Sequence, residues 1–172
     1  MTIPAQKFRE ILFQLLYSHT IGRPANDDMV DLLTHELSVT KKVVREAIER
    51  LQLLLKHLSE IDALIEKASY SYAFERIQTV EKNILRIGVF ELLFDDTIPA
   101  KVAIAEGIRL SKKFSTKESA SFVNAILDAI YQSSLGNKVD KLQVKKCAEE
   151  LVKIEDISLT LLDADKNFLV KE

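Results

Sequence analysis

Apolar residues recur at spacings of three and four along most of the chain, which is the pattern of amphipathic helices. In residues 5–19 they form one stripe: Phe8, Ile11, Leu12, Leu15 and Leu16. The same pattern predicts further helices over about 28–37, 41–57, 60–67, 79–94, 99–114 and 116–135. The segment 79–94 is apolar almost all round, so we expect it to be a buried central helix.

Residues that favour helix ends stand between these segments. Thr40 can cap the helix that follows it. Ser59 and Ser115 are each followed three residues later by an acidic residue, the pattern of a capping box. Gly136 is suited to a left-handed stop. The sequence therefore predicts an all-α protein, a compact bundle of about seven helices.

The character of the sequence changes after Asn137. VDKLQVKKCAEELVKIEDI predicts one extra amphipathic helix, whereas ISLTLL and NFLV flank DADK and could form a small hairpin. There is no Gly/Ser linker between the two parts. We therefore expect a helical domain over 1–136, with a C-terminal extension over 137–172 that packs on it.

Composition limits the class of protein. Only four Gly and three Pro occur, with 47% hydrophobic and 29% charged residues, which favours a helical globular protein over a disordered or membrane protein. Arg9 and Glu10 interrupt the first apolar segment, so it is neither a signal peptide nor a membrane span. One cysteine, Cys147, allows no internal disulfide, which fits a reducing cytoplasm. With a net charge of −2, any RNA binding must come from a local patch.

The sequence shows no catalytic or cofactor motif. Phosphate-binding and dinucleotide-binding glycine patterns are absent, as is a nucleophile elbow. His19, His35 and His57 each stand alone, without the partners that a zinc site shows. We therefore expect no metal, no cofactor and no enzymatic activity.

A mixed basic and aromatic strip lies opposite the apolar stripe of the first helix. Helical spacing aligns Arg9, Phe13 and Tyr17 there, with Lys7 at the margin. Two interpretations remain open for this strip. The rings could pack under a neighbouring element, or the strip could face a ligand.

Three motifs occur in order along the chain: VEK-x-x-LR, then EL-x-x-x-x-x-IP-x-KVAI-x-E, then KF-x-x-x-x-x-x-x-FVN. Together with FREILFQLLYSH near the N-terminus, they resemble the NusB family of bacterial transcription antitermination factors. The resemblance implies two three-helix bundles and no catalysis. It also implies binding of single-stranded boxA RNA together with the ribosomal protein NusE, so that the RNA polymerase complex reads through terminators in ribosomal RNA operons.

The resemblance also implies which residues bind. The residues at family positions near RNA are Lys7, Arg9, Tyr17, Tyr70, Arg86, Glu118 and Phe122. Periodicity alone equally allows core packing for Phe122 and, for Arg86, a buried ion pair with Glu118 or Glu91. Those that would face NusE are Glu75 and Glu81, for which a helix-cap or dipole role is the alternative.

The chain departs from the family pattern in three places. The dense N-terminal arginine run is reduced to Lys7 and Arg9, a glycine after FVN is replaced by Ala125, and the tail beyond Gly136 is longer than usual. A protein-interaction module with little RNA affinity is therefore an alternative. The front domain of an RNA methyltransferase is a weaker one, because no methyl-donor-binding segment follows. A homodimer that pairs through the RNA-facing surface is a further expectation.

Overall fold

The computed structural model describes the backbone of residues 3–70 and 72–169 and the side chains of these residues up to Asp163. Within this range the chain is helical and contains no strand, which confirms the predicted all-α class. The helices are α1 (Ala5–Thr20), α2 (Asp27–Glu36), α3 (Lys41–Lys56), α4 (Leu58–Ser69), α5 (Thr79–Leu93), α6 (Ala100–Phe114), α7 (Lys117–Ser134) and α8 (Lys141–Leu169). A short 3-10 helix, η1 (Phe74–Arg76), precedes α5 and was not predicted.

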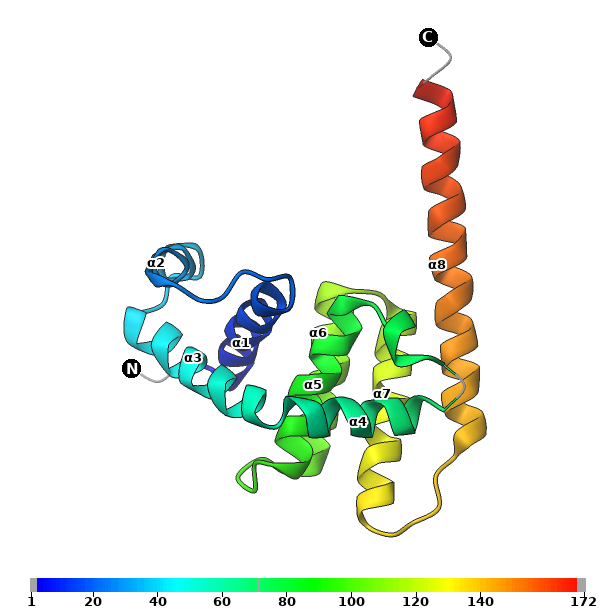
Figure 1. The fold of residues 1–172 in the computed structure, drawn as a ribbon, viewed down its shortest axis with the longest axis horizontal. Coiled ribbons are helices and arrows are strands. Elements are labelled where there is room, and N and C mark those ends of the chain that lie inside the picture. Colours follow the sequence, from blue (N-terminus) through cyan, green and yellow to red (C-terminus); the bar gives the residue numbers. More distant parts are fainter. Residues whose placement is uncertain (1–2, 71, 170–172) are drawn as a thin grey trace.

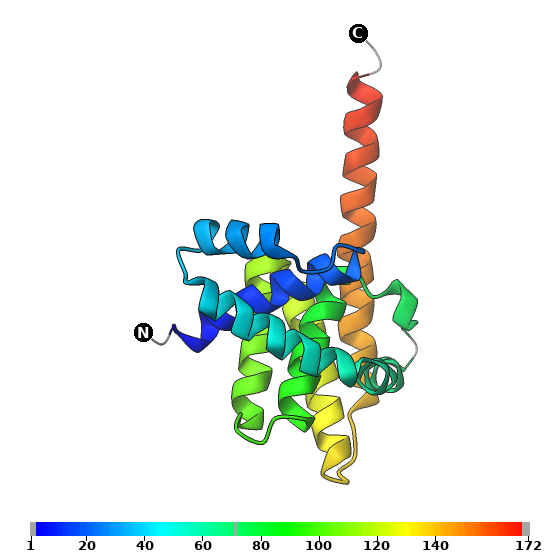
Figure 2. The same ribbon diagram turned by 60° about the vertical axis from the view of Figure 1, so that its left-hand side comes forward.

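The helices form two groups, and α5 contacts helices of both. Helices α1, α2 and α3 lie together on one side, and α5, α6 and α7 on the other, with α4 packed across α5 and α7 (Figures 1 and 2). Helix α5 contacts α1, α3, α4, α6 and α7. Residues 83–91 of α5 are all buried, which confirms it as the central helix. The apolar stripe of α1 is buried against it, Phe8 excepted, which is partly buried.

Two glycines allow the helices around α5 to approach closely. A Cβ atom added to Gly88 in α5 would lie 2.8 Å from Leu127 of α7, and one added to Gly107 in α6 would lie 2.7 Å from the same side chain. Leu127 is fully buried and therefore fills the space left by both glycines. Moving Leu127 away from one glycine would press it against the other.

Several predicted helix ends are confirmed, and two are wrong. Thr40 accepts a hydrogen bond from the Val43 amide, and Gly136 has a φ of 75° after α7. Ser59 caps no helix, because α4 begins at Leu58 directly after α3. Thr116, not Ser115, caps α7, because the Ser115 hydroxyl donates to Glu81 instead.

The predicted hairpin in the C-terminal extension is wrong. Helix α8 continues through DADK as far as Leu169, because the segment contains neither glycine nor proline to stop it. Val170, the last residue of the predicted second strand, lies outside the described residues. Val144, Cys147, Ala148 and Leu151 of α8 are buried against the bundle, whereas the later part of the helix rises away from it (Figure 1). None of the described helices has the length and apolarity needed to cross a bilayer.

We predict that Gly107→Ala destabilises the protein by about 1–2 kcal/mol, because overpacking in the core outweighs the gain of about 1 kcal/mol in helix propensity. The same substitution in a Leu127→Ala background should instead stabilise, because the methyl group then has room. Urea unfolding of the four proteins measures both effects. A stabilising Gly107→Ala in the wild-type background would contradict the proposed close packing.

Candidate nucleic-acid interface

An open groove of about 450 Å³ lies where the C-terminal end of α1 meets η1 and the start of α5. Its lining includes Tyr17, Glu75, Arg76 and Lys82. Tyr17 is 36% exposed, so part of its ring is free to contact a ligand. An exposed aromatic ring beside two cations is the combination that binds unpaired nucleotides, through base stacking and phosphate contacts. We call this the Tyr17 groove.

Both cations of the Tyr17 groove lie over aromatic rings. The Arg76 guanidinium carbon lies 5.3 Å from the centre of the Tyr72 ring, and the Lys82 Nζ lies 4.4 Å from the centre of the Phe74 ring. Burial, and then the charge of nearby Arg86, lower the pKa of Lys82 from its ordinary value. Each ring face attracts its cation, which favours a position on the groove wall.

Arg9, expected on the RNA face, is buried between helices instead. Its Nε lies 2.7 Å from Glu91 of α5, and its Nη1 lies 3.5 Å from Glu106 of α6. Burial raises the pKa of Glu91 above its ordinary value, although the charges of Arg9 and Arg50 oppose the shift. The guanidinium of Arg9 thus neutralises buried carboxylates and does not face solvent.

A second set of ion pairs continues from this buried pair toward the surface. Arg109 lies 2.9 Å from Glu106 and 2.7 Å from Glu10, and Lys113 lies 2.7 Å from the other oxygen of Glu10. Burial by itself would raise the pKa of Glu10, but hydrogen bonds from Lys113 and Arg109 lower it overall. The exposed edge between α1 and α6 is therefore charge-balanced rather than basic.

Two aromatic rings that the sequence left open as ligand contacts lie in the core. Phe13 is 5% exposed and stacks on Phe114, with 4.5 Å between ring centres. Phe122 is fully buried, with its ring 5.7 Å from that of Tyr72. Of the two interpretations left open by periodicity, core packing is the one observed for both. In this structure, neither ring offers a face on which a base could stack.

Arg86 is also buried in an ion pair, but with a partner that was not predicted. Its Nε and Nη2 each lie 2.8 Å from an oxygen of Asp62 in α4, and its Nη1 donates to Asn83. The buried ion pair that periodicity allowed for Arg86 is therefore observed, but its partner is Asp62, across the α4–α5 contact, rather than Glu118 or Glu91. This bidentate pair fixes α4 against α5.

The two acidic residues expected to face a protein partner differ in exposure. Glu75 is exposed on η1 and lines the Tyr17 groove. Glu81 is 3% exposed, and its Oε1 accepts hydrogen bonds from the hydroxyls of Ser115 and Ser119. Glu81 also lines a cleft whose opposite wall is α8. Only Glu75 is directly accessible.

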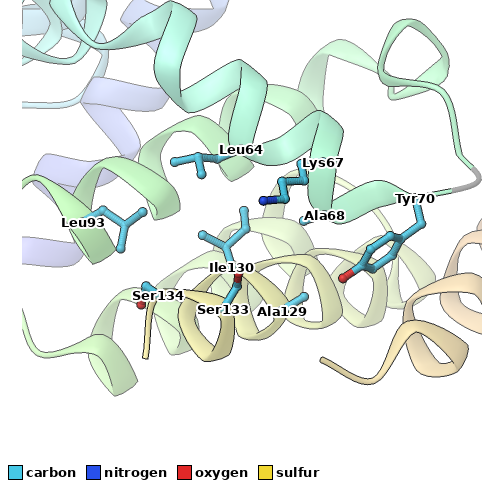
Figure 3. Close-up of a pocket in the computed structure, with 9 residues that line it drawn as sticks. All are labelled: Leu64, Lys67, Ala68, Tyr70, Leu93, Ala129, Ile130, Ser133 and Ser134. Atoms are coloured by element: carbon cyan, nitrogen blue, oxygen red, sulfur yellow. The ribbon is translucent and has the colours of Figure 1, made fainter. Parts of the chain in front are cut away.

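Tyr70, Lys7 and Glu118 lie outside the Tyr17 groove. Tyr70 is 38% exposed at the rim of a mainly apolar pocket between α4 and α7 (Figure 3). The Lys141 Nζ of α8 lies 5.1 Å from the centre of its ring. Lys7 and Glu118 are partly exposed in α1 and in the first turn of α7. The structure thus brings Tyr17 and Glu75 together, but does not gather the other predicted residues in this groove.

Sequence reasoning missed Arg76 and Lys82, the two cations of the groove. One signal was available: Tyr70, Tyr72 and Phe74 alternate in a short segment and are followed by a cation at 76. Basic residues interleaved with aromatic ones are typical of surfaces that bind single-stranded nucleic acid.

Comparison with known proteins gives one consistent result. The sequence model of the NusB family matches residues 6–132. The transcription antitermination protein NusB of Chlamydia pneumoniae is 38% identical over 135 residues, covering 78% of this chain and 84% of that protein.

Two solved structures are similar to this fold. T. maritima NusB has a TM-score of 0.65 and 29% identity, covering 84% of this chain and 99% of that chain. A chain from the crystal structure of antitermination factors NusB and NusE in complex with dsRNA has a TM-score of 0.63 and 27% identity, covering 74% of this chain and 96% of that chain.

The buried pair of Arg9 and Glu91 gives a prediction with a defined pH dependence. Arg9→Met should cost about 3–5 kcal/mol at neutral pH, because an uncompensated charge stays buried. Without the guanidinium, the Glu91 pKa rises further, so the folded state holds a proton that the unfolded state releases. The loss of unfolding free energy in Arg9→Met should therefore be small at about pH 5 and grow as the pH rises toward about 8.

Urea unfolding of wild type and Arg9→Met across this pH range is the measurement. In the matched control, Arg9→Met with Glu91→Met, most of the stability and its pH profile should return, because no charge is left unpaired at that point. A stability difference that does not change with pH would show that Glu91 is not the group affected.

Proposed function

The chain belongs to the NusB family, and we propose that it is a non-catalytic transcription antitermination factor. It binds single-stranded boxA-type RNA together with NusE, within a complex that lets RNA polymerase read through terminators in ribosomal RNA operons. The similar solved complex of NusB, NusE and dsRNA supports RNA and NusE as partners. The match of the family model over residues 6–132 supports transfer of the role to the helical bundle.

The Tyr17 groove is the single observation that supports RNA binding most directly. Tyr17 presents part of its ring to solvent, and Arg76 and Lys82 line the same groove. A base can stack on the ring while the two cations contact the neighbouring phosphates. No catalytic group is required for this role, which is binding and positioning alone.

The affinity of the isolated protein for RNA should be modest. Of the two basic residues near the N-terminus, Arg9 is used in the buried ion pair, which leaves Lys7. Each phosphate contact on a single strand contributes about 0.7 to the dependence of log affinity on log salt, so few contacts give weak binding. We infer that NusE contributes much of the affinity of the complex.

Glu75 supports a partner surface next to the RNA surface. It is exposed and lines the same groove as Arg76, so a protein bound at Glu75 would lie beside an RNA bound at Tyr17. The loss of Arg9 as a contact also favours the second candidate function, a protein-interaction module with little RNA affinity of its own. The two candidates differ in whether RNA is held specifically once NusE is present.

Fluorescence anisotropy of labelled RNA separates these candidates. A boxA-type strand, a scrambled strand and a double-stranded form are each mixed with the protein, with and without NusE, at low and physiological salt. Tighter binding of the boxA-type strand in the presence of NusE supports the antitermination role. Equal binding of the boxA-type and scrambled strands by the complex would overturn it in favour of the interaction module.

We predict that Tyr17→Ala weakens RNA binding by the complex about 5- to 150-fold, because a stacked base contributes about 1–3 kcal/mol. Lys82→Ala should lower the salt dependence of binding by about 0.7, which corresponds to one lost phosphate contact. Both variants should unfold at nearly the wild-type temperature, since the two side chains are only partly buried.

Tyr131→Ala, which removes a partly exposed ring from the last turn of α7, is the matched control and should bind RNA like wild type. RNA titrations at several salt concentrations, with thermal unfolding of each variant, make the comparison. Wild-type affinity in Tyr17→Ala would exclude the Tyr17 groove as the stacking site.

A further inference from the structure

We infer that the C-terminal helix α8 carries a second phosphate-binding surface, formed by Lys141, Lys145 and Lys153, which extends the RNA path beyond the Tyr17 groove. The partner is the same single-stranded RNA, so this inference rests on the proposed function. It assigns a role to a helix that lies beyond residue 132, where the match to the family model ends.

Three cations from different elements each lie over an aromatic ring of the segment that precedes α5. Three aromatic residues alternate along one segment, at positions 70, 72 and 74. Each carries a cation from a different element: Lys141 of α8 over Tyr70, Arg76 of η1 over Tyr72, and Lys82 of α5 over Phe74. A cation over a ring face is attracted to the ring itself, and Arg76 and Lys141 remain exposed, so a phosphate can reach them.

Lys141, Lys145 and Lys153 form a row along α8. Positions 141, 145, 149 and 153 follow one another at four-residue spacing, which places them in a row of about 18 Å at 1.5 Å per residue. Lys145, Lys153 and Arg76 line an open groove of about 390 Å³ beside Tyr72. Glu149 lines the same groove, so its three cations outnumber its one carboxylate.

The groove lined by Lys145 and Lys153 and the Tyr17 groove are adjacent, because Arg76 lines both. A strand that stacks on Tyr17 and passes Arg76 can continue along α8 to Lys153 and Lys145. An extended row of separated cations fits the regular spacing of phosphates along a strand better than it fits an acidic protein, whose carboxylates have no fixed repeat. We therefore assign this surface to RNA.

The surface also fits the electrostatics of the whole chain. The net charge is −2, so binding of a polyanion depends on local concentrations of positive charge. Arg9 is buried in an ion pair, whereas Lys141, Lys145 and Lys153 are all exposed. The C-terminal extension thus supplies the exposed cations that the N-terminal helix lacks.

The test compares two full-length variants that each lose three positive charges. One is Lys141→Ala/Lys145→Ala/Lys153→Ala. The other, a matched control, removes exposed lysines of α3 and α6: Lys42→Ala/Lys56→Ala/Lys101→Ala. Both are titrated with a boxA-type RNA with and without flanking nucleotides, with NusE present and absent, at about 50 and 200 mM salt.

For the α8 variant, we expect the salt dependence of log affinity to fall by about 2, which is about 0.7 for each of three contacts. That corresponds to about a twentyfold smaller loss of affinity between the two salt concentrations. The effect should be confined to RNA with flanking nucleotides, and the control variant should behave like wild type. Circular dichroism confirms that both variants remain helical.

Other outcomes would overturn the inference in distinguishable ways. If wild type binds the RNA and both triple variants lose the same affinity, only net charge matters, and the α8 surface is excluded while the proposed function stands. If the α8 variant instead binds NusE less tightly in the absence of RNA, the surface belongs to a protein partner. If wild type itself shows no preference for boxA-type RNA, the proposed function and this inference both fail.

Discussion

The buried ion pair between Arg9 and Glu91, with Glu106 beside it, is the interaction on which the arrangement of the bundle depends. It joins α1 to α5 and α6 where all three side chains are largely buried, so removing Arg9 alone would leave Glu91 without its ion-pair partner. The same pair removes the most prominent N-terminal cation from the surface. The cations that line the two open grooves lie elsewhere, around η1 and on α8.

Helical periodicity was sufficient to predict most of the fold. The stripe of α1 and the nearly apolar α5 each have a spacing that only a buried helix explains, and Thr40 and Gly136 mark helix ends by local chemistry alone. The hairpin was predicted wrongly because ISLTLL is a short apolar run rich in residues that also suit strands. A continuous helix was favoured instead because DADK offers no turn residue that requires a positive φ.

The candidate site was less predictable, because its members depend on tertiary contacts. Periodicity placed Arg9, Arg86 and Phe122 on helices but could not determine what faces them; the carboxylate that pairs with Arg9 lies 82 positions away. Family resemblance identified Tyr17 and Glu75, which the structure does bring into one groove. Arg76 and Lys82 were missed because the rings that support them belong to the irregular segment before α5, whose path no repeating pattern describes.

The projecting half of α8 also affects how the molecule moves in solution. A helix of 29 residues is about 44 Å long, and it is anchored to the bundle only along its first part. The protein is therefore elongated rather than spherical, with a helix that projects from a helical bundle (Figure 1). Its rotational diffusion should be anisotropic, and its frictional coefficient larger than that of a sphere of 19.5 kDa. In size-exclusion chromatography, an elongated protein elutes earlier than a sphere of the same mass. A mass derived from the elution volume alone would therefore be too high.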